Sequence, residues 1–467
     1  MASEALPVER LHAYLGGLPP ETQASLVATL ERALLRGEHI PAVNLILERL
    51  RPAIPTMACR PPRTASPARM FFEPLTPFLT SHNAPTLPPG LIARASLTPL
   101  WNWIGRDLVR EPARIYRAQA NVALLAPDLP HAAQLARNFQ DYVAQAISNL
   151  LERLDTDEKG RRRAAAQTGT LRGLLDVREL LVILRNRDRL ADFSHHLPER
   201  IANLTGAQAE QLLVRLMTMT HANPEILPFT LVMLKGRLQN ETQLIRLAVM
   251  SAASDMAIRV AQAPLAPAVS LILGELHLFV ADLRGRLKEN RIADAVYALR
   301  RLRDGIRGVQ TELDLSRDSA WSREFHALRG EVAELLQREI QPMPALVRRL
   351  LRAPQGHEAL SKAGPNEIDV ADAEARLTFV IASRSFANEL AVNQISREVH
   401  LELQRYIERA APALIDALRD APPQERRYRR AQAEAAVRFA AKVFGSEYAA
   451  QLSRAITIAG EPRAAQA

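Results

Sequence analysis

Cysteine is almost absent from this chain of 467 residues. Cys59 is the single one, and it lies in a proline-rich stretch where it has no partner for an intramolecular disulfide. Secreted proteins held together by disulfides and zinc sites built on cysteine pairs are therefore excluded. The first residues also carry no cationic segment followed by an apolar run, as a secretory signal would. We expect a cytoplasmic protein.

Long apolar runs are missing too. The most apolar window, residues 265–283, is interrupted by Pro267, Glu275, His277 and Asp282, which makes it a poor candidate for crossing a bilayer. Lysine is the other rarity, because only five of the 60 basic residues are lysine and the rest are arginine. The formal net charge of +9 suggests an anionic partner, but a coding bias toward arginine explains the same excess without any ligand.

Sequence signatures of catalysis are also lacking. Phosphate-binding loops need several glycines in a fixed pattern, and neither a P-loop nor a dinucleotide fingerprint occurs. No serine lies in the frame of a nucleophile elbow. We therefore predict no cofactor and no small-molecule substrate, and we expect a protein that is not an enzyme, although residues distant in sequence can still converge into a site.

Metal-binding patterns are absent as well. Helical metal sites place carboxylates and imidazoles one turn apart, whereas Glu275 and His277 are two residues apart and point in different directions. The adjacent pair His195 and His196 is more typical of a helix end than of a metal site. Asp369 and Asp372 share a helical face, but they are explained by their place in a first helical turn, where acids complement the macrodipole. We predict no metal site.

What the sequence does contain is helical periodicity. One apolar stripe with steps of three and four residues runs from Ile292 to Leu313, and a second runs from Phe325 to Ile340. We expect these two helices to pack as an antiparallel pair across the break at 314–318. Glycine and aromatic residues are scarce, which argues against a strand-rich fold. The sequence thus predicts an all-α fold, a multi-helix array of stacked antiparallel helices, in general shape solenoid-like, with a proline-rich extended arm.

Proline and glycine clusters divide this array. We predict breaks at Pro412 and at 421–423 in the last helical part, since proline interrupts helical hydrogen bonding. The predicted parts are a short N-terminal helical unit (1–51), a proline-rich arm or linker (52–99), a central helical array (100–355), a C-terminal helical block (366–459) and a disordered tail (460–467).

The densest anomaly is the aromatic part of the arm and the residues that follow it. Its candidate interaction residues are Phe71, Phe72, Phe78, Trp101 and Trp103. The interpretation we favour is that these side chains pack into a groove of the chain's own helices, each contributing about 1.5–3 kcal/mol by burial. A membrane-interface anchor and insertion into a partner chain are the alternatives.

Arginine clusters are the second candidate. Arg426, Arg427, Arg429 and Arg430 surround Tyr428 and form a candidate anion-binding patch, because guanidinium groups bind phosphates and a tyrosine ring can stack on a base. The same tyrosine can equally pack on a neighbouring helix.

These observations predict a non-enzymatic helical scaffold or adaptor, whose partner is another protein or a second copy of the chain. The alternative is a peripheral binder of an anionic membrane surface or of nucleic acid, which uses its arginine patches. The three-dimensional placement of residues 70–110 separates the two most directly.

Overall fold

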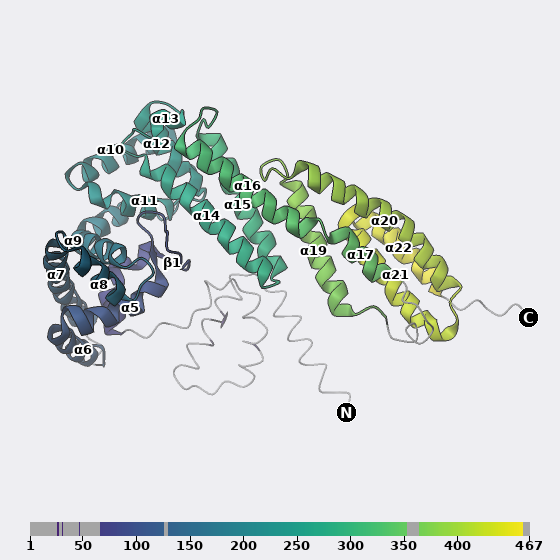
Figure 1. Ribbon diagram of the computed structural model, residues 1–467, viewed down its shortest axis with the longest axis horizontal. Helices are drawn as coiled ribbons and strands as arrows, with labels where there is room; N and C mark the ends of the chain where they lie inside the picture. The colour runs from purple at the N-terminus through teal and green to yellow at the C-terminus, as the bar shows by residue number, and fades with distance from the viewer. Residues whose placement is uncertain are drawn as a thin grey trace, which may run out of the picture. The chain divides into compact units, whose positions relative to one another are not determined.

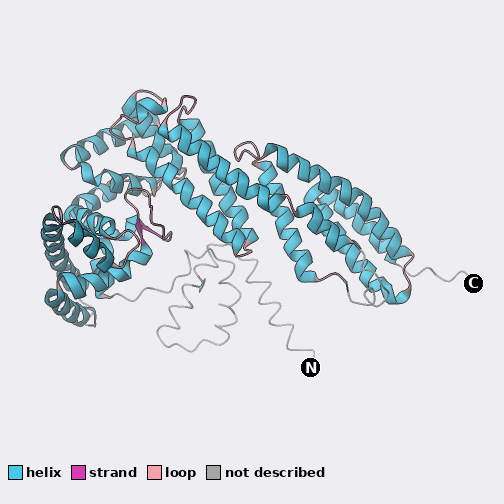
Figure 2. Ribbon diagram, viewed as in Figure 1, coloured by secondary structure: helices cyan, strands magenta, loops and turns pink. Residues whose placement is uncertain are grey.

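The computed structural model describes residues 66–125, 129–352 and 364–460, together with Leu26, Val27, Leu30 and Ile46. The structure is 79% helical with almost no strands, as Figures 1 and 2 illustrate, which confirms the predicted all-α fold. The predicted N-terminal unit, apart from those four residues, and most of the predicted tail lie outside the described residues.

The helices follow one another with short connections. In chain order they are α4 (Pro67–Phe71), α5 (Leu97–Trp103), α6 (Arg110–Leu125), α7 (Leu129–Leu154), α8 (Glu158–Thr168), α9 (Leu174–His195), α10 (Gly206–Ala222), α11 (Leu227–Lys235), α12 (Leu244–Ala252), α13 (Ala257–Val260), α14 (Pro267–Lys288), α15 (Ile292–Glu312), α16 (Ala320–Ile340), α17 (Met343–Leu351), α19 (Glu367–Ser385), α20 (Asn393–Arg419), α21 (Pro423–Phe444) and α22 (Ser446–Gly460). No helix among the described residues is long and apolar enough to cross a membrane.

Short irregular helices and one small sheet complete the described chain. The irregular helices are η2 (Glu73–Phe78), η3 (Arg94–Ser96), the π turn η4 (Ile104–Leu108), η5 (Pro224–Ile226) and η6 (Glu241–Gln243). Strands β1 (Leu79–Thr80) and β2 (Ile92–Ala93) pair in parallel, with Leu79 opposite Ile92. The predicted arm is therefore folded into short elements from residue 66 onward.

The described residues group into two compact units. The first contains residues 66–73 and 109–143, and the second contains residues 74–108 and 144–460. In the first unit α4 packs on α6, and the Tyr116 hydroxyl donates a hydrogen bond of 2.8 Å to the carbonyl of Pro67. The Tyr116 ring also stacks on Phe139 of α7 with 4.5 Å between centroids.

Both predicted apolar stripes form the buried faces of helices in the second unit. The stripe from Ile292 to Leu313 is buried along α15, and most of the stripe from Phe325 to Ile340 is buried along α16. The predicted pairing of these two helices is wrong, however. Helix α15 forms its hairpin with the preceding α14, and α16 packs on α14 and α20 (Figure 1).

The turn between α14 and α15 explains this difference. Only residues 289–291 separate the two helices, and Asn290 takes a positive φ of 56°, a conformation that asparagine tolerates better than most residues. So short a connection returns the chain directly onto α14. The break after Glu312 is longer, which leaves α16 free to pack elsewhere.

The C-terminal block consists of α19 to α22, and α21 and α22 form an antiparallel hairpin. The predicted break at Pro412 is wrong, because α20 continues through it. Proline deprives the carbonyl four residues earlier of its donor, but both Pro412 and Glu408 are exposed, so water can satisfy that carbonyl. The cost of about 3 kcal/mol is offset by burial of Leu414, Ile415 and Leu418, about 1.5–3 kcal/mol each.

One histidine of this block gives a testable pH dependence. His400 of α20 is 3% exposed, and burial lowers its pKa below the ordinary value, with Arg384 lowering it further. The unfolded chain therefore takes up a proton at a higher pH than the folded chain, and acidification favours unfolding. We expect the free energy of unfolding, measured with urea at pH 7.5 and 5.5, to fall more in the wild type than in His400→Leu. An equal loss in both proteins would contradict this.

Candidate functional site

The aromatic residues of the arm in the first unit are covered by that unit itself. Phe71 and Phe72 are buried and meet edge to face, with 4.9 Å between their centroids. Phe71 also lies 5.3 Å from the ring of Phe139, and the Gln140 side chain donates a hydrogen bond of 2.9 Å to the Phe71 carbonyl. Both rings thus belong to the core of this unit.

The remaining aromatic residues of the candidate set lie in the second unit. Phe78 is buried against Phe229 of α11, with 5.1 Å between ring centroids. Trp103 is buried and Trp101 is half-buried. Packing within the chain therefore accounts for these side chains. A membrane anchor needs exposed aromatic residues, whereas four of the five candidates are buried.

A buried ionic cluster ties residues 91–96 to α9. Asp176 is fully buried, and its carboxylate accepts hydrogen bonds from Arg172 Nη1 at 3.1 Å and from Ser96 Oγ at 2.9 Å. Arg172 also donates to the carbonyl of Leu91 at 2.9 Å and to both oxygens of Glu179 at 2.8 Å. Sequence reasoning missed this cluster, because its partners are separated by about eighty residues along the chain.

Residues 88–90 of the arm pack closely against α11 and α14. Gly90 has a φ of +84°, and a Cβ atom there would lie 2.7 Å from the carbonyl oxygen of Pro228. Gly274 of α14 faces Pro88 in the same way, at 2.8 Å. Only glycine allows these two approaches, so residues 88–90 have a fixed place within the second unit.

The arginines of the candidate anion-binding patch do not converge. Their positions on α21 spread over about 160° of the helix surface. Arg429 lies 3.7 Å from Glu425, and Arg430 donates a hydrogen bond of 3.2 Å to the carbonyl of Gly460. Tyr428 is buried, so its ring cannot stack on a base.

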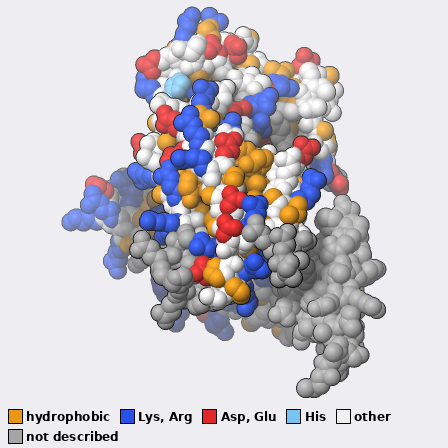
Figure 3. Space-filling view, turned by 90° about the vertical axis from the view of Figure 1, so that its right-hand side faces the viewer, with side chains coloured by type: hydrophobic (Ala, Val, Ile, Leu, Met, Phe, Trp, Pro, Cys, Tyr) orange, Lys and Arg blue, Asp and Glu red, His pale blue; other side chains and the backbone are white. Residues whose placement is uncertain are grey.

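The acidic face that begins α19 has basic partners. Asp372 accepts from Arg376 at 2.9 Å, and the nearby Glu374 lies 2.7 Å from Arg438 and 3.3 Å from Lys442. No group of His, Cys, Asp or Glu within the described ranges has the arrangement of a metal site. Basic and acidic side chains also lie side by side over the face shown in Figure 3.

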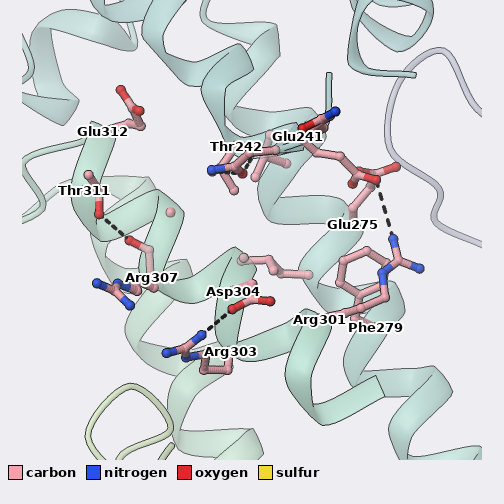
Figure 4. Close-up of a pocket in the computed structure, with 16 residues that line it drawn as sticks. Glu241, Thr242, Glu275, Phe279, Arg301, Arg303, Asp304, Arg307, Thr311 and Glu312 are labelled. Atoms are coloured by element: carbon pink, nitrogen blue, oxygen red, sulfur yellow. Dashed lines mark hydrogen bonds and ion pairs between the residues drawn. The ribbon is translucent and has the colours of Figure 1, made fainter. Parts of the chain in front are cut away.

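The feature most like a site is a groove in the second unit, between η6, α14 and α15 (Figure 4). Its volume is about 480 Å³. Sixteen residues line it, among them Glu241 and Thr242 of η6, Glu275 and Phe279 of α14, and an α15 face that includes Arg301, Arg303, Asp304, Arg307, Thr311 and Glu312. Sequence reasoning did not predict this site.

Two glycines of α15 allow the walls of the groove to lie close together. A Cβ atom at Gly305 would lie 2.5 Å from Leu276 of α14, and one at Gly308 would lie 2.1 Å from the Thr242 hydroxyl of η6. The glycines therefore let α15 approach both neighbours closely. They lie on the same face as Arg301 and Asp304, because steps of three and four residues return to one side of a helix.

A buried ion pair joins the lining residue Glu275 to α11. Lys235 of α11 donates a hydrogen bond to Glu275 Oε1, and the two side chains are 14% and 10% exposed. Burial raises the pKa of Glu275 above its ordinary value, while Lys235 acts in the opposite direction. The second oxygen, Oε2, is buried and accepts no hydrogen bond from any described residue. A buried acceptor left unsatisfied is costly.

The rim of the groove carries both signs of charge. Arg301 lies over the Phe279 ring at 4.3 Å and 3.5 Å from Glu241, and Arg303 donates to Asp304 at 2.6 Å. Glu312 forms an ion pair with Arg246 of α12. Arg307 has no acidic partner in the part of the chain that the structure describes, so it is the uncompensated cation of the groove.

The carboxylates that line the groove all have basic partners. Glu275 pairs with Lys235, Glu241 with Arg301, Asp304 with Arg303 and Glu312 with Arg246. One signal in the sequence pointed toward the groove, because Glu275 is a lone acid between apolar residues of its helix. The site must be interpreted from its own geometry, since no protein-family model, curated protein or solved structure matches the chain.

Proposed function

We propose that this protein is a non-enzymatic helical scaffold or adaptor that binds a segment of another protein in the groove between η6, α14 and α15. The observation that carries the proposal is the open groove of about 480 Å³, which exposes Phe279 and Arg307, a cation without an acidic partner among the described residues. A partner segment can place an apolar group on Phe279 and an acidic group at Arg307.

The helical support of the groove favours such a role. Both long walls are helices with buried apolar faces, and α15 packs on α19 as well as on α14. Binding groups on packed helices lose little conformational freedom when a partner arrives. The charged rim, with acidic and basic residues in close pairs, offers polar contacts without strong attraction to any single class of polyion.

The single cysteine supports a reducing compartment, and we place this scaffold in the cytoplasm. The arrangement of the candidate anion-binding patch does not favour the alternative of a peripheral membrane or nucleic-acid binder. Of its four patch arginines, only Arg427 is both exposed and without a hydrogen bond or ion pair to any residue that the structure describes.

A phage-displayed library of linear 12-residue peptides tests the proposal. Thr311 is exposed and lines the groove, so Thr311→Trp obstructs it without disturbing the core. Arg300 is exposed on the same helix outside the groove, which makes Arg300→Trp the matched control. We expect enriched clones that bind the wild type and Arg300→Trp alike and bind Thr311→Trp about tenfold more weakly, a loss of about 1.4 kcal/mol.

Clones that bind all three proteins equally, or no enrichment at all, would contradict the proposal. Sedimentation of the same three proteins measures self-association and so tests the other possible partner, a second copy of the chain. Self-association that is lost only in Thr311→Trp would identify that copy as the occupant of the groove.

A further inference from the structure

The groove continues beyond the end of α15. A second pocket of about 500 Å³ adjoins it, lined by Asp255, residues 313–316 and the side chains of Phe325 and His326, with Gln310. Thr311 lines both pockets, so the two lie next to each other along α15 and its C-terminal loop, and together we call them the depression. This inference rests on the proposed function, because it specifies the partner of the same groove.

The length of the depression indicates an extended ligand. Arg301 and Asp314 are thirteen residues apart, which corresponds to about 20 Å at the rise of an α-helix. An extended peptide covers that distance with about six residues. A compact small molecule would fill only one of the two pockets.

The two pockets differ in charge. In the first pocket, Glu275 and Glu312 are neutralised by Lys235 and Arg246, Glu241 and Asp304 lie near Arg301 and Arg303, and Arg307 remains as an excess cation. The second pocket is lined by Asp255 and Asp314 and by no lysine or arginine.

The acids of the second pocket are available to a ligand. Hydrogen bonds from Ser316 hold the pKa of Asp314 below its usual range, so this carboxyl is ionised at neutral pH. Asp255 is exposed, and its carboxylate has no hydrogen bond or ion pair to the described residues. A cationic side chain would complement both.

We propose that the depression binds an extended peptide segment of about six to eight residues with an acidic residue at Arg307 and a basic residue at Asp255 and Asp314. Charge separation along the segment, rather than its net charge, selects the partner.

Two fluorescein-labelled octapeptides of identical composition test this selection. In one, two glutamates and two lysines occupy opposite ends, and in the other the four charged residues alternate. We expect the wild type to bind the separated peptide about tenfold more tightly by fluorescence anisotropy, and this preference to shrink as salt screens the charges.

Charge reversal at Arg307 tests whether the acidic residues of the peptide bind there. Arg307→Glu should bind the separated peptide about tenfold more weakly and should gain affinity for a third peptide with lysines at both ends. Arg300→Glu, an equal change on the same helix outside the depression, should leave all affinities unchanged.

The possible failures are distinguishable. Phage clones that depend on Thr311, together with equal affinity for the separated and alternating peptides, would overturn the charge selection and leave the scaffold proposal standing. No groove-dependent binding of any peptide would overturn both. Equal weakening by Arg307→Glu and Arg300→Glu would show a general charge effect and would also overturn the selection.

Discussion

Asp176→Ala should lower the free energy of unfolding by about 3–5 kcal/mol, the usual cost of breaking a buried ion pair by removing one partner. Asp176 is fully buried and accepts from both Arg172 and Ser96. Its removal leaves the Arg172 guanidinium, 6% exposed, with less compensating charge. Urea unfolding at neutral pH measures the effect.

The matched control is Asp192→Ala on the same helix. Its side chain is 68% exposed, and its contacts with His196 and Arg215 are at 3.4 and 3.9 Å. Exposed pairs of this kind contribute about 0–1 kcal/mol, so the control should unfold close to the wild type. Similar losses in both variants would mean that the buried cluster does not hold residues 91–96 on α9.

Gly90→Ala should destabilise the protein by about 2–4 kcal/mol for two separate reasons. A residue with a Cβ atom is strained at a φ of +84°. The new methyl group would also lie 2.7 Å from the Pro228 carbonyl oxygen, which is part of the backbone and cannot rotate away. Thermal and urea unfolding both measure the loss.

Gly285→Ala should have the opposite effect on stability. Gly285 lies inside α14, and no atom would come within 4 Å of its Cβ. Alanine there should stabilise the protein by about 0.5–1 kcal/mol, because it favours the helix and meets no obstacle. If Gly90→Ala were as harmless as Gly285→Ala, residues 88–90 would not pack on α11 and α14 as described.

The arm and the groove are connected through α14. Pro88 packs against Gly274, which directly precedes Glu275 in the wall of the groove. A variant that loosens residues 88–90 should therefore also displace Glu275 in the wall of the groove. For this reason, binding variants are best placed on exposed positions of α15, such as Thr311 and Arg307.

Much of the fold could be predicted because helical periodicity is a local property. The stripe from Ile292 to Leu313 requires only that residues of one face be buried, and it is buried along its whole length. Which helix covers that face is not local. The three-residue turn at 289–291 places α14 against this face of α15. Because Pro412 is exposed, α20 can continue through it.

The groove could not be predicted because its parts come together only in space. Lys235, Glu275 and Arg301 belong to three helices and share no sequence pattern. Gly305 and Gly308 were visible in the sequence, but their role depends on Leu276 and Thr242, which face them. The aromatic residues of the arm were visible too, and their burial reflects packing that composition alone does not determine.

Hydroxyl-radical footprinting of the full chain, with and without a groove-dependent peptide, tests the central claim most directly. Phe279 lines the first pocket and Leu315 the second, whereas Tyr297 is 61% exposed on α15 and lines neither. We predict that bound peptide protects Phe279 and Leu315 from oxidation and leaves Tyr297 unchanged. Unchanged oxidation of Phe279 and Leu315, with protection elsewhere, would contradict the account.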